Sequence, residues 1–301
     1  MDKVVKLKPT IKSAIWGGSF FQKDKKIDAP IISELWELSV RGLDSSIIVS
    51  GKDEGKRLDE IISNNDVGPV SERFPYFPLL IKLIDAKENL SVQVHPSDEY
   101  ALKKYNSFGK TEMWHIISAD KGSGIYVGFN KDYSKQEIEQ KLNDSTILDA
   151  LNFFEVKPED TFVINSGTIH AIGKGVRLIE IQQNSDLTFR LYDYLRKDKD
   201  GNYRPLHIKE ALDVIDYKKF KKSENSGDLL ANSKYFHVVR KTFDGELTIK
   251  ANHSSFVSFT FLDGEGKVDD INYQKYDTFF LSFNKECHVK GKGTLIISEV
   301  R

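Results

Sequence analysis

The sequence predicts a mainly β protein that contains two related β-barrels with helical additions. Short aromatic and aliphatic runs, many of them carried by 19 Phe and 12 Tyr residues, recur along the chain between turn residues, and this is the pattern of strands. Helical periodicity is confined to a few short segments. An internal repeat supports two units, and 301 residues leave room for two domains of roughly 150 residues.

Period-two alternation and short buried runs identify the individual strands. The predicted strands are residues 79–85, 90–95, 111–118, 124–127, 161–165, 177–183, 187–192, 235–240, 256–262, 278–283 and 294–299. Because strands come early and late with helical segments between them, the pattern favours a β scaffold with a helical insertion.

Three segments predict helices. Ser134 followed by Glu137 is a capping box, and the helix that it begins places Ile138 and Leu142 on one face. A second helix is predicted over residues 207–217, and a third over 57–63.

The internal repeat links the two halves of the chain. Asp160-Thr161-Phe162-Val163-Ile164 resembles residues 277–281, and the segment from His170 to Gly175 aligns with 288–293 after one inserted residue. Matched pieces in the same order favour duplication over chance. We therefore predict two domains, residues 1–220 and residues 221–301, with the polar stretch 221–228 as the linker.

Composition excludes several classes of protein. Forty-four Lys and Arg residues balance 45 Asp and Glu residues, which gives a formal net charge of −1. We therefore expect no nucleic-acid partner and no electrostatic attachment to a membrane. The single cysteine, Cys287, excludes a zinc site made of several cysteines. No apolar run approaches a bilayer span and no signal peptide is evident, so the sequence predicts a soluble, cytoplasmic protein.

A first candidate metal-binding pair lies in the strand predicted over residues 90–95. Its alternation places Ser91, Gln93 and His95 on one face, so that Gln93 and His95 project side by side. Seen alone, such a pair fits a metal site or a hydrogen-bonded pair in a sheet equally well.

Glu112 and His170 complete the candidate set. In the strand 111–118, Glu112 shares a face with Trp114, which is a costly place for a carboxylate unless a cation compensates it. His115 points the other way and is predicted to be structural. His170 follows a Ser-Gly turn and re-enters a strand facing inward. Two imidazoles and a carboxylate suit zinc, iron(II) or manganese.

Two basic residues accompany this set. Arg190 lies in the strand 187–192, on the face opposite to its apolar side chains. It could stabilise an anionic group, or form an ordinary surface ion pair. Lys110 stands two residues before Glu112 and could act as an acid, a base or a phosphate anchor, or be solvated.

The motifs together resemble the type I mannose-6-phosphate isomerases (phosphomannose isomerases) of the short bacterial group, which belong to the cupin superfamily. The matching segments are Ile15-Trp16-Gly17-Gly18, Trp36-Glu37-Leu38-Ser39, residues 78–86, residues 90–96, Lys110-Thr111-Glu112-Met113, Gly167-Thr168-Ile169-His170-Ala171 and Gln183-Asn184-Ser185-Asp186. They cover the first two-thirds of the chain in order. The chain departs from the family pattern in turns, notably at Glu159, where the family usually has glycine.

The resemblance implies two cupin-type jelly-roll barrels, the second of them degenerate, and one Zn²⁺ per chain held by Gln93, His95, Glu112 and His170. It implies that Arg190 and Lys110 are catalytic. The expected substrate is a hexose 6-phosphate, and the expected oligomeric state is a monomer or a weak dimer.

The reaction implied by the resemblance is the reversible conversion of mannose 6-phosphate to fructose 6-phosphate through a cis-enediol. Three candidates for the group that moves the proton remain: Lys110, Glu180 and a hydroxide held by the metal. Two other functions also stay open. One is an iron(II)-dependent cupin oxygenase, because two histidines and a carboxylate form its facial triad. The other is a sugar-phosphate-binding cupin without catalysis.

Overall fold

The computed structural model describes residues 1–74, 76–197, 200–222 and 227–300, and it divides into two compact units. Unit 1 comprises Met1–Lys12, Ser19–Leu83 and Asn225–Arg301, and unit 2 comprises Ser13–Gly18 and Ile84–Glu224. The passage at 224/225 lies close to the predicted boundary at 220/221. Much of the segment before residue 84, however, belongs to unit 1. Within the predicted linker, residues 223–226 lie outside the described residues.

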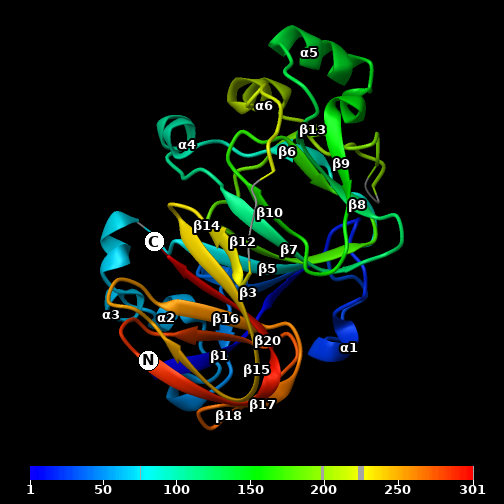
Figure 1. Cartoon of the computed structure of the whole chain (residues 1–301). Helices are drawn as coiled ribbons and strands as arrows, with labels where there is room; N and C mark the ends of the chain where they lie inside the picture. Colours follow the sequence, from blue (N-terminus) through cyan, green and yellow to red (C-terminus); the bar gives the residue numbers. More distant parts are fainter. Residues whose placement is uncertain (75, 198–199, 223–226, 301) are drawn as a thin grey trace. The chain divides into compact units, whose positions relative to one another are not determined.

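Unit 1 is built on an antiparallel sheet with the strand order β14-β15-β20-β16-β19-β1-β4, and β17 pairs with both β18 and β20. Figure 1 shows the blue N-terminal strand β1 among the orange and red C-terminal strands. The bounds are β1 (Val4–Lys8), β4 (Ile47–Ile48), β14 (Leu229–Asn232), β15 (Phe236–Lys250), β16 (Val257–Phe261), β17 (Glu265–Val268), β18 (Ile271–Gln274), β19 (Thr278–Leu281) and β20 (Glu286–Val300).

The remaining elements of unit 1 are short. The strands β2 and β3 pair antiparallel, and β5 begins in unit 1 and ends in unit 2. Their bounds, with those of the helices, are β2 (Thr10–Lys12), α1 (Gln22–Lys25), β3 (Glu34–Leu38), η1 (Gly42–Asp44), η2 (Gly51–Asp53), α2 (Leu58–Ile61), α3 (Asn64–Val67), η3 (Pro69–Arg73) and β5 (Leu79–Ala86).

Aromatic side chains fill the core of unit 1. The rings of Phe259 and Phe279 stack at 5.3 Å between centroids, and those of Phe261 and Tyr273 stack at 3.7 Å. All four side chains are at most 3% exposed. The predicted strands 256–262 and 278–283 supply three of them, which confirms the β prediction for this unit.

The paired strands β15 and β20 are much longer than predicted. They pair from Phe236↔Val300 to Lys250↔Glu286, whereas the sequence pattern predicted only residues 235–240 and 294–299. Gly291 lies inside β20, where a Cβ atom would come within 2.4 Å of the carbonyl oxygen of Glu265 in β17. The second Gly-Lys-Gly of the repeat is therefore part of a strand, while the first lies in the turn between β11 and β12.

Unit 2 contains the strand orders β10-β7-β12 and β13-β6-β11-β8-β9. Every pairing within these two groups is antiparallel. The bounds are β6 (Val92–Val94), α4 (Asp98–Tyr105), β7 (Glu112–Ala119), β8 (Gly124–Phe129), α5 (Lys135–Asn143), η4 (Ile147–Ala150), β9 (Leu151–Glu155), β10 (Thr161–Ile164), β11 (His170–Ile172), β12 (Val176–Gln183), β13 (Phe189–Tyr192) and α6 (Ile208–Val214).

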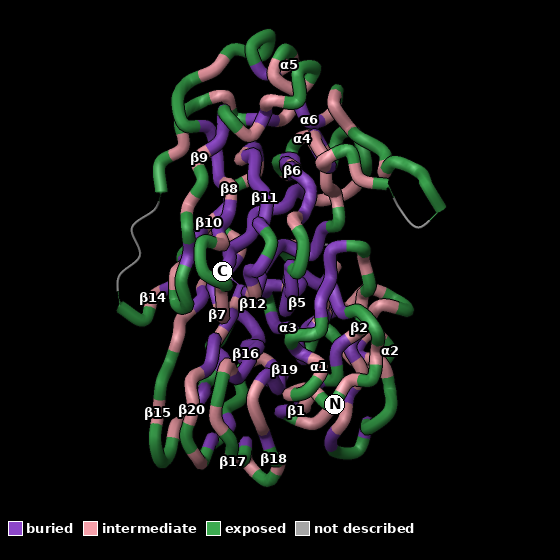
Figure 2. The backbone as a smooth tube through the Cα atoms, turned by 90° about the vertical axis from the view of Figure 1, so that its right-hand side faces the viewer, coloured by how far each residue is buried: buried purple, intermediate pink, exposed green. Residues whose placement is uncertain are grey.

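The two faces of β6 belong to different environments. Val92 and Val94 pack in a cluster with Ala211 and Leu212 of α6. Trp114 of β7 instead joins a second apolar cluster, which includes side chains of β8 and β12. Figure 2 shows the backbone of β6, β8 and β11 as largely buried and that of α5 as largely exposed. Alternation along the strands therefore leaves Gln93 facing away from the helices.

The helices confirm part of the sequence prediction. Glu137 accepts a hydrogen bond from the backbone N–H of Ser134, and the Ser134 hydroxyl caps the first turn of α5. The predicted helices 207–217 and 57–63 are present in shorter form, as α6 and α2, whereas α4 was not predicted. Glu159 has φ +76°, a conformation that favours glycine. No helix in the described part of the chain combines the length and apolarity needed to cross a membrane.

Candidate metal centre

Three neighbouring strands place the candidate residues in one row. His170 of β11 lies directly opposite Gln93 of β6, and Arg190 of β13 lies opposite Gln93 on its other side. Directly opposed residues of antiparallel strands share a face of the sheet. Gln93, His170 and Arg190 therefore project in the same direction, as the alternation predicted. His95 follows β6, and Glu112 begins β7.

His95, Glu112 and His170 form a compact buried group. One ligand atom from each lies within 4.8 Å of the others. The Nε2 atom of His95 is 3.5 Å from Glu112 Oε2, and the Nε2 atom of His170 is 3.4 Å from Glu112 Oε1. The structure therefore brings together three residues that the sequence analysis selected from separate segments.

Backbone carbonyl groups orient both imidazoles. The Nδ1 atom of His95 lies 2.9 Å from the carbonyl oxygen of Leu187, and that of His170 lies 2.8 Å from the carbonyl oxygen of Thr168. A carbonyl can only accept, so each Nδ1 carries the proton and each Nε2 keeps its lone pair. This is the tautomer that a metal-binding histidine uses.

Electrostatics keep the group in a metal-ready state. Burial lowers the pKa of His95 to about 3 and also lowers the pKa of His170, so both rings are neutral. Burial by itself would raise the pKa of Glu112, but the Lys110 ammonium holds that pKa well below its usual value. Neutral imidazoles and an ionised carboxylate are the ligand forms that metals require.

The buried acceptor atoms fit a cation. Among the described residues, His95 Nε2 and Glu112 Oε1 have no hydrogen-bond donor, although unsatisfied buried acceptors are costly. Glu112 Oε2 lies 2.9 Å from Lys110 Nζ, so it is compensated by charge. Two imidazole nitrogens and a carboxylate oxygen form a donor set that binds divalent metals.

Gln93 adjoins this group. Its Nε2 atom lies 3.2 Å from His170 Nε2, the same ring atom that a metal would use. A half-turn of the amide exchanges nitrogen for oxygen and would present Oε1 as an additional oxygen donor. Ligation by Gln93 stays a prediction.

Lys110 lies inside the site and links two carboxylates. Its side chain is 5% exposed, and its Nζ atom lies 2.9 Å from Glu112 and 3.8 Å from Glu180 Oε1. The other oxygen of Glu180 accepts a hydrogen bond of 2.9 Å from the Trp114 indole. The buried ammonium therefore faces the candidate ligand on one side and a second fixed carboxylate on the other.

Arg190 is half-buried and lacks a carboxylate partner within 4 Å among the described residues. It donates to the Ser91 hydroxyl at 3.2 Å and to the Pro205 carbonyl oxygen at 2.9 Å. These contacts fix the guanidinium but do not neutralise it. The surface ion pair that we considered for Arg190 is therefore not formed, and its charge is available to an anion.

The segment that carries Lys110 is held from two sides, by residues that the sequence analysis did not select. Gln183 accepts from the Thr111 N–H at 2.8 Å and donates to Asp98 at 3.0 Å. Asp98 accepts from the Gly109 N–H at 3.0 Å. We call residues 108–111 the lysine strap. The Gln183-Asn184-Ser185-Asp186 motif, which supported only the family resemblance, contains one of the residues that hold the strap and could have indicated this contact.

A second unpredicted network lies next to Arg190. The buried carboxylate of Asp193 accepts from Arg204 Nε at 2.7 Å and from Arg196 Nη2 at 2.5 Å. Repulsion by Arg204 and Arg196 adds to burial in lowering the pKa of Arg190. Two guanidinium groups thus bind one carboxylate, and together with the nearby Arg190 they leave excess positive charge beside the site. The sequence feature that could have indicated this network is the regular spacing of Arg190, Asp193 and Arg196.

Two other histidines, His115 and His288, lie outside the metal-binding group. His115 is buried and its Nδ1 atom lies 2.9 Å from the Thr161 hydroxyl, which confirms its structural role. His288, the counterpart of His170 in the repeat, lies on β20 with 57% of its side chain exposed. In the described part of the chain, His95, Glu112 and His170 form the one group of three or more metal-binding side chains.

A cupin-type β fold with a buried centre of two histidines and one carboxylate defines the class of protein. The family model for the catalytic domain of type I phosphomannose isomerase matches residues 4–127. Mannose-6-phosphate isomerase ManA of Bacillus subtilis is 34% identical over 97% of this chain and 98% of its own length. The chain therefore belongs to the type I phosphomannose isomerase family.

Further comparisons agree with this assignment. Mannose-6-phosphate isomerase of Streptococcus mutans is 34% identical over 87% of this chain and 85% of its own length. The crystal structure of the mannose 6-phosphate isomerase of Bacillus subtilis superposes with a TM-score of 0.88 at 31% identity, covering 99% of each chain. The apo phosphomannose isomerase of Salmonella typhimurium, at 16% identity and a TM-score of 0.79, shows the shared fold.

Proposed function

We propose that this chain is a zinc-dependent isomerase that interconverts mannose 6-phosphate and fructose 6-phosphate. The observation that carries the proposal is the buried group of His95, Glu112 and His170, with both Nε2 lone pairs directed at the carboxylate, in a chain of the phosphomannose isomerase family. These three residues would hold the metal, with Gln93 as the fourth donor. When bound, zinc supplies a Lewis acid that polarises the oxygens of a carbonyl substrate.

The basic side chains support a phosphorylated sugar as the substrate. Arg190 keeps an uncompensated guanidinium on the same face of the sheet as Gln93 and His170, and Arg196 and Arg204 add positive charge nearby. We propose that Arg190 binds the phosphate or the negative charge that develops on the enediolate. A fixed guanidinium in a partly buried site stabilises such charge more strongly than an exposed one.

The isomerisation must move a proton between C1 and C2 of the sugar. We propose that Lys110 Nζ and the Glu180 carboxylate, 3.8 Å apart, hold and transfer this proton. The Trp114 indole donates to the other oxygen of Glu180 and so fixes its orientation. Burial of Lys110 and Glu180 excludes bulk water from the exchange.

Two histidines and a carboxylate also fit an iron(II) oxygenase. Membership of the phosphomannose isomerase family is the observation that favours isomerisation over oxygenation. The cytoplasmic location and the monomeric or weakly dimeric state stay predictions.

A coupled assay of mannose 6-phosphate isomerisation tests this function, with chelator, with added zinc and with added iron(II). We expect turnover that the chelator abolishes and zinc restores. Arg190→Ala should lower kcat/KM by about 10²- to 10³-fold while the bound zinc, measured by elemental mass spectrometry, stays near the wild-type amount. The exposed Arg73 provides the control variant Arg73→Ala.

Other outcomes would contradict particular parts of the proposal. Binding of mannose 6-phosphate without turnover would favour the non-catalytic cupin, and oxygen uptake with iron(II) would favour the oxygenase. Equal loss of zinc and turnover in Arg190→Ala would make Arg190 a structural residue.

A further inference from the structure

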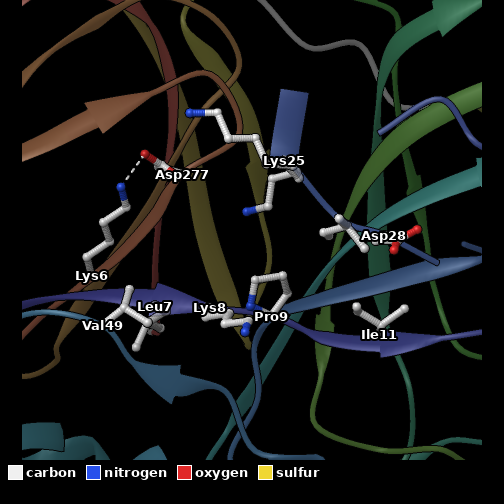
Figure 3. A pocket seen from close by; sticks show the side chains of 11 residues that line it. Lys6, Leu7, Lys8, Pro9, Ile11, Lys25, Asp28, Val49 and Asp277 are labelled. Atoms are coloured by element: carbon white, nitrogen blue, oxygen red, sulfur yellow. Dashed lines mark ion pairs between the residues drawn. The ribbon is translucent and has the colours of Figure 1, made fainter. Parts of the chain in front are cut away.

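Unit 1 contains a pocket of about 400 Å³ that the proposed isomerase does not use (Figure 3). This volume falls in the range of small-molecule sites. The pocket lies where the end of β1 and the start of β2 meet the segment that follows α1. Its lining residues are Lys6, Leu7, Lys8, Pro9, Ile11, Lys25, Lys26, Ile27, Asp28, Val49 and Asp277.

Two of the four lysines in this pocket are fixed by partners. Lys6 Nζ lies 2.6 Å from Asp277 and 3.2 Å from the carbonyl oxygen of Asn272. Lys25 is 5% exposed, lies 3.0 Å from the fully buried Glu37, and donates to the Tyr276 carbonyl oxygen at 2.8 Å. Figure 3 shows the Lys6–Asp277 pair on one side of the pocket and Asp28 on the other. These tethered side chains give the pocket a pre-formed polar wall.

The other two lysines carry charge that the described residues do not neutralise. Lys8 and Lys26 are exposed, and no described carboxylate lies within 4 Å of either ammonium. Lys26 ends α1 with φ +53°, a position that favours glycine. The lysine at this position adds an ammonium to the pocket. Lys8 and Lys26 come from segments 18 residues apart in sequence, and both line one cavity.

The remaining wall combines apolar carbon with hydrogen-bond acceptors. Pro9 and Ile11 present apolar surface, and 38% of Ile11 is exposed. Asp28 is exposed and, among the described residues, has no cation within 4 Å. A ligand that matches all three features has an anionic group for the free lysines, hydroxyl donors for the aspartates and C–H faces for the apolar wall. Phosphorylated sugars combine these three properties.

We propose that this pocket is a second ligand site, which binds a phosphorylated sugar. Lys8 and Lys26 hold the phosphate, Asp28 and Asp277 accept hydrogen bonds from sugar hydroxyls, and the C–H face of the sugar packs on Pro9 and Ile11. The site goes beyond the proposed function because every lining residue belongs to unit 1, whereas the candidate metal centre belongs to unit 2.

Isothermal titration calorimetry of the full chain with glucitol 6-phosphate tests the proposal, because this sugar alcohol phosphate has no carbonyl group to isomerise. The pocket variant is Lys8→Glu/Lys26→Glu. The matched control is Lys23→Glu/Lys267→Glu, which makes the same charge change at two exposed lysines of unit 1 outside the pocket lining.

The titrations of the wild type and of the control should both contain a binding component for glucitol 6-phosphate. The affinity of this component should fall by about tenfold or more in the pocket variant, as expected for lost charged hydrogen bonds. For this component, glucitol and inorganic phosphate should each show an affinity at least about tenfold lower than that of glucitol 6-phosphate. Added salt should weaken it as well, since the two free lysines are exposed. The pocket variant should isomerise mannose 6-phosphate at the wild-type rate.

The proposal is overturned if the pocket variant titrates like the wild type, or if the control loses the component to the same extent. Equal affinity for inorganic phosphate would also overturn it, because the pocket would then be a simple anion site. Failure of the proposed isomerase function would appear separately, as absence of mannose 6-phosphate turnover by the wild type.

Discussion

At the scale of single residues, the ionised groups of the candidate site are arranged in sets rather than as isolated pairs. Asp193 illustrates this, because one carboxylate orders two guanidinium groups beside Arg190. Burial would raise the pKa of Asp193, but its hydrogen bonds from Arg204 and Arg196 outweigh burial and lower that pKa. A carboxyl whose pKa is lower in the folded state stabilises the fold above its unfolded pKa and loses that contribution as the pH falls.

We therefore predict that Asp193→Asn destabilises the protein by about 2 kcal/mol near neutral pH, since it leaves two partly buried guanidinium groups without their partner carboxylate. The difference between wild type and variant should stay constant above about pH 5 and shrink below about pH 4, where the unfolded carboxyl is protonated. Thermal unfolding followed at several pH values measures this. Asp132→Asn removes an exposed ion pair with Lys218 and should change little. A pH-independent difference would contradict the prediction.

Alternation along strands is why single residues of the metal centre could be predicted. The sequence predicts the strand face of Glu112 from its spacing to Trp114. It predicts the face of Gln93 from the flanking residues Val92 and Val94. The partners of Lys110 and Arg190 could not be predicted in the same way. Glu180, Ser91 and Pro205 reach them from other strands or loops, and these contacts depend on cross-strand register, which local sequence does not specify.

At the scale of elements, hydrogen bonds on both sides of the lysine strap fix the position of Lys110 in the site. Residues 108–111 lie against the segment before α4 on one side and the turn after β12 on the other. Gly109 permits this approach, because a Cβ atom there would lie 2.5 Å from the Asp98 nitrogen and 2.7 Å from the Pro96 carbonyl oxygen. Both are backbone atoms, so the strap itself would have to move.

Gly109→Ala should therefore lower isomerase turnover by about 10²-fold, because displacement of a catalytic group by about 1 Å has effects of this size. The assay is mannose 6-phosphate turnover, with the unfolding midpoint measured in parallel. Gly122→Ala is the control: its φ is +77° with open space around it, so it should cost about 1 kcal/mol of stability and leave turnover intact. Unchanged turnover in Gly109→Ala would show that the strap does not position Lys110.

Sequence patterns predicted most strands of unit 2 and, in unit 1, β16 and β19, but they missed β1, β3 and most of β15 and β20. The middle parts of β15 and β20 are exposed and carry charged residues, so they lack the alternation of a half-buried strand. Their pairing with each other, and that of β20 with β17, continues the strands across these exposed stretches. The α5 helix was predicted because its capping box and apolar face are local signals.

At the scale of the whole molecule, each unit has an apolar cluster of its own. The core of unit 1 contains Phe259, Phe261 and Phe279, and the candidate metal centre lies entirely in unit 2. The chain nevertheless passes between the units at 12/13, 18/19, 83/84 and 224/225. Repeat patterns could predict that there are two units. They could not predict that the N-terminal strand β1 pairs with β19, because that contact joins distant ends of the sequence.

Metal binding should stabilise the units unequally. A ligand that binds only the folded state adds about 4 kcal/mol when its concentration is about 1,000 times its dissociation constant. Removal of the metal also leaves His95 Nε2 and Glu112 Oε1 buried without partners. Both effects act on unit 2. In hydrogen–deuterium exchange with and without chelator, peptides from β6, β7 and β11 should therefore lose protection, while peptides from β16 and β19 should exchange as before. Loss of protection to the same extent in both units would mean that the two cores unfold as one.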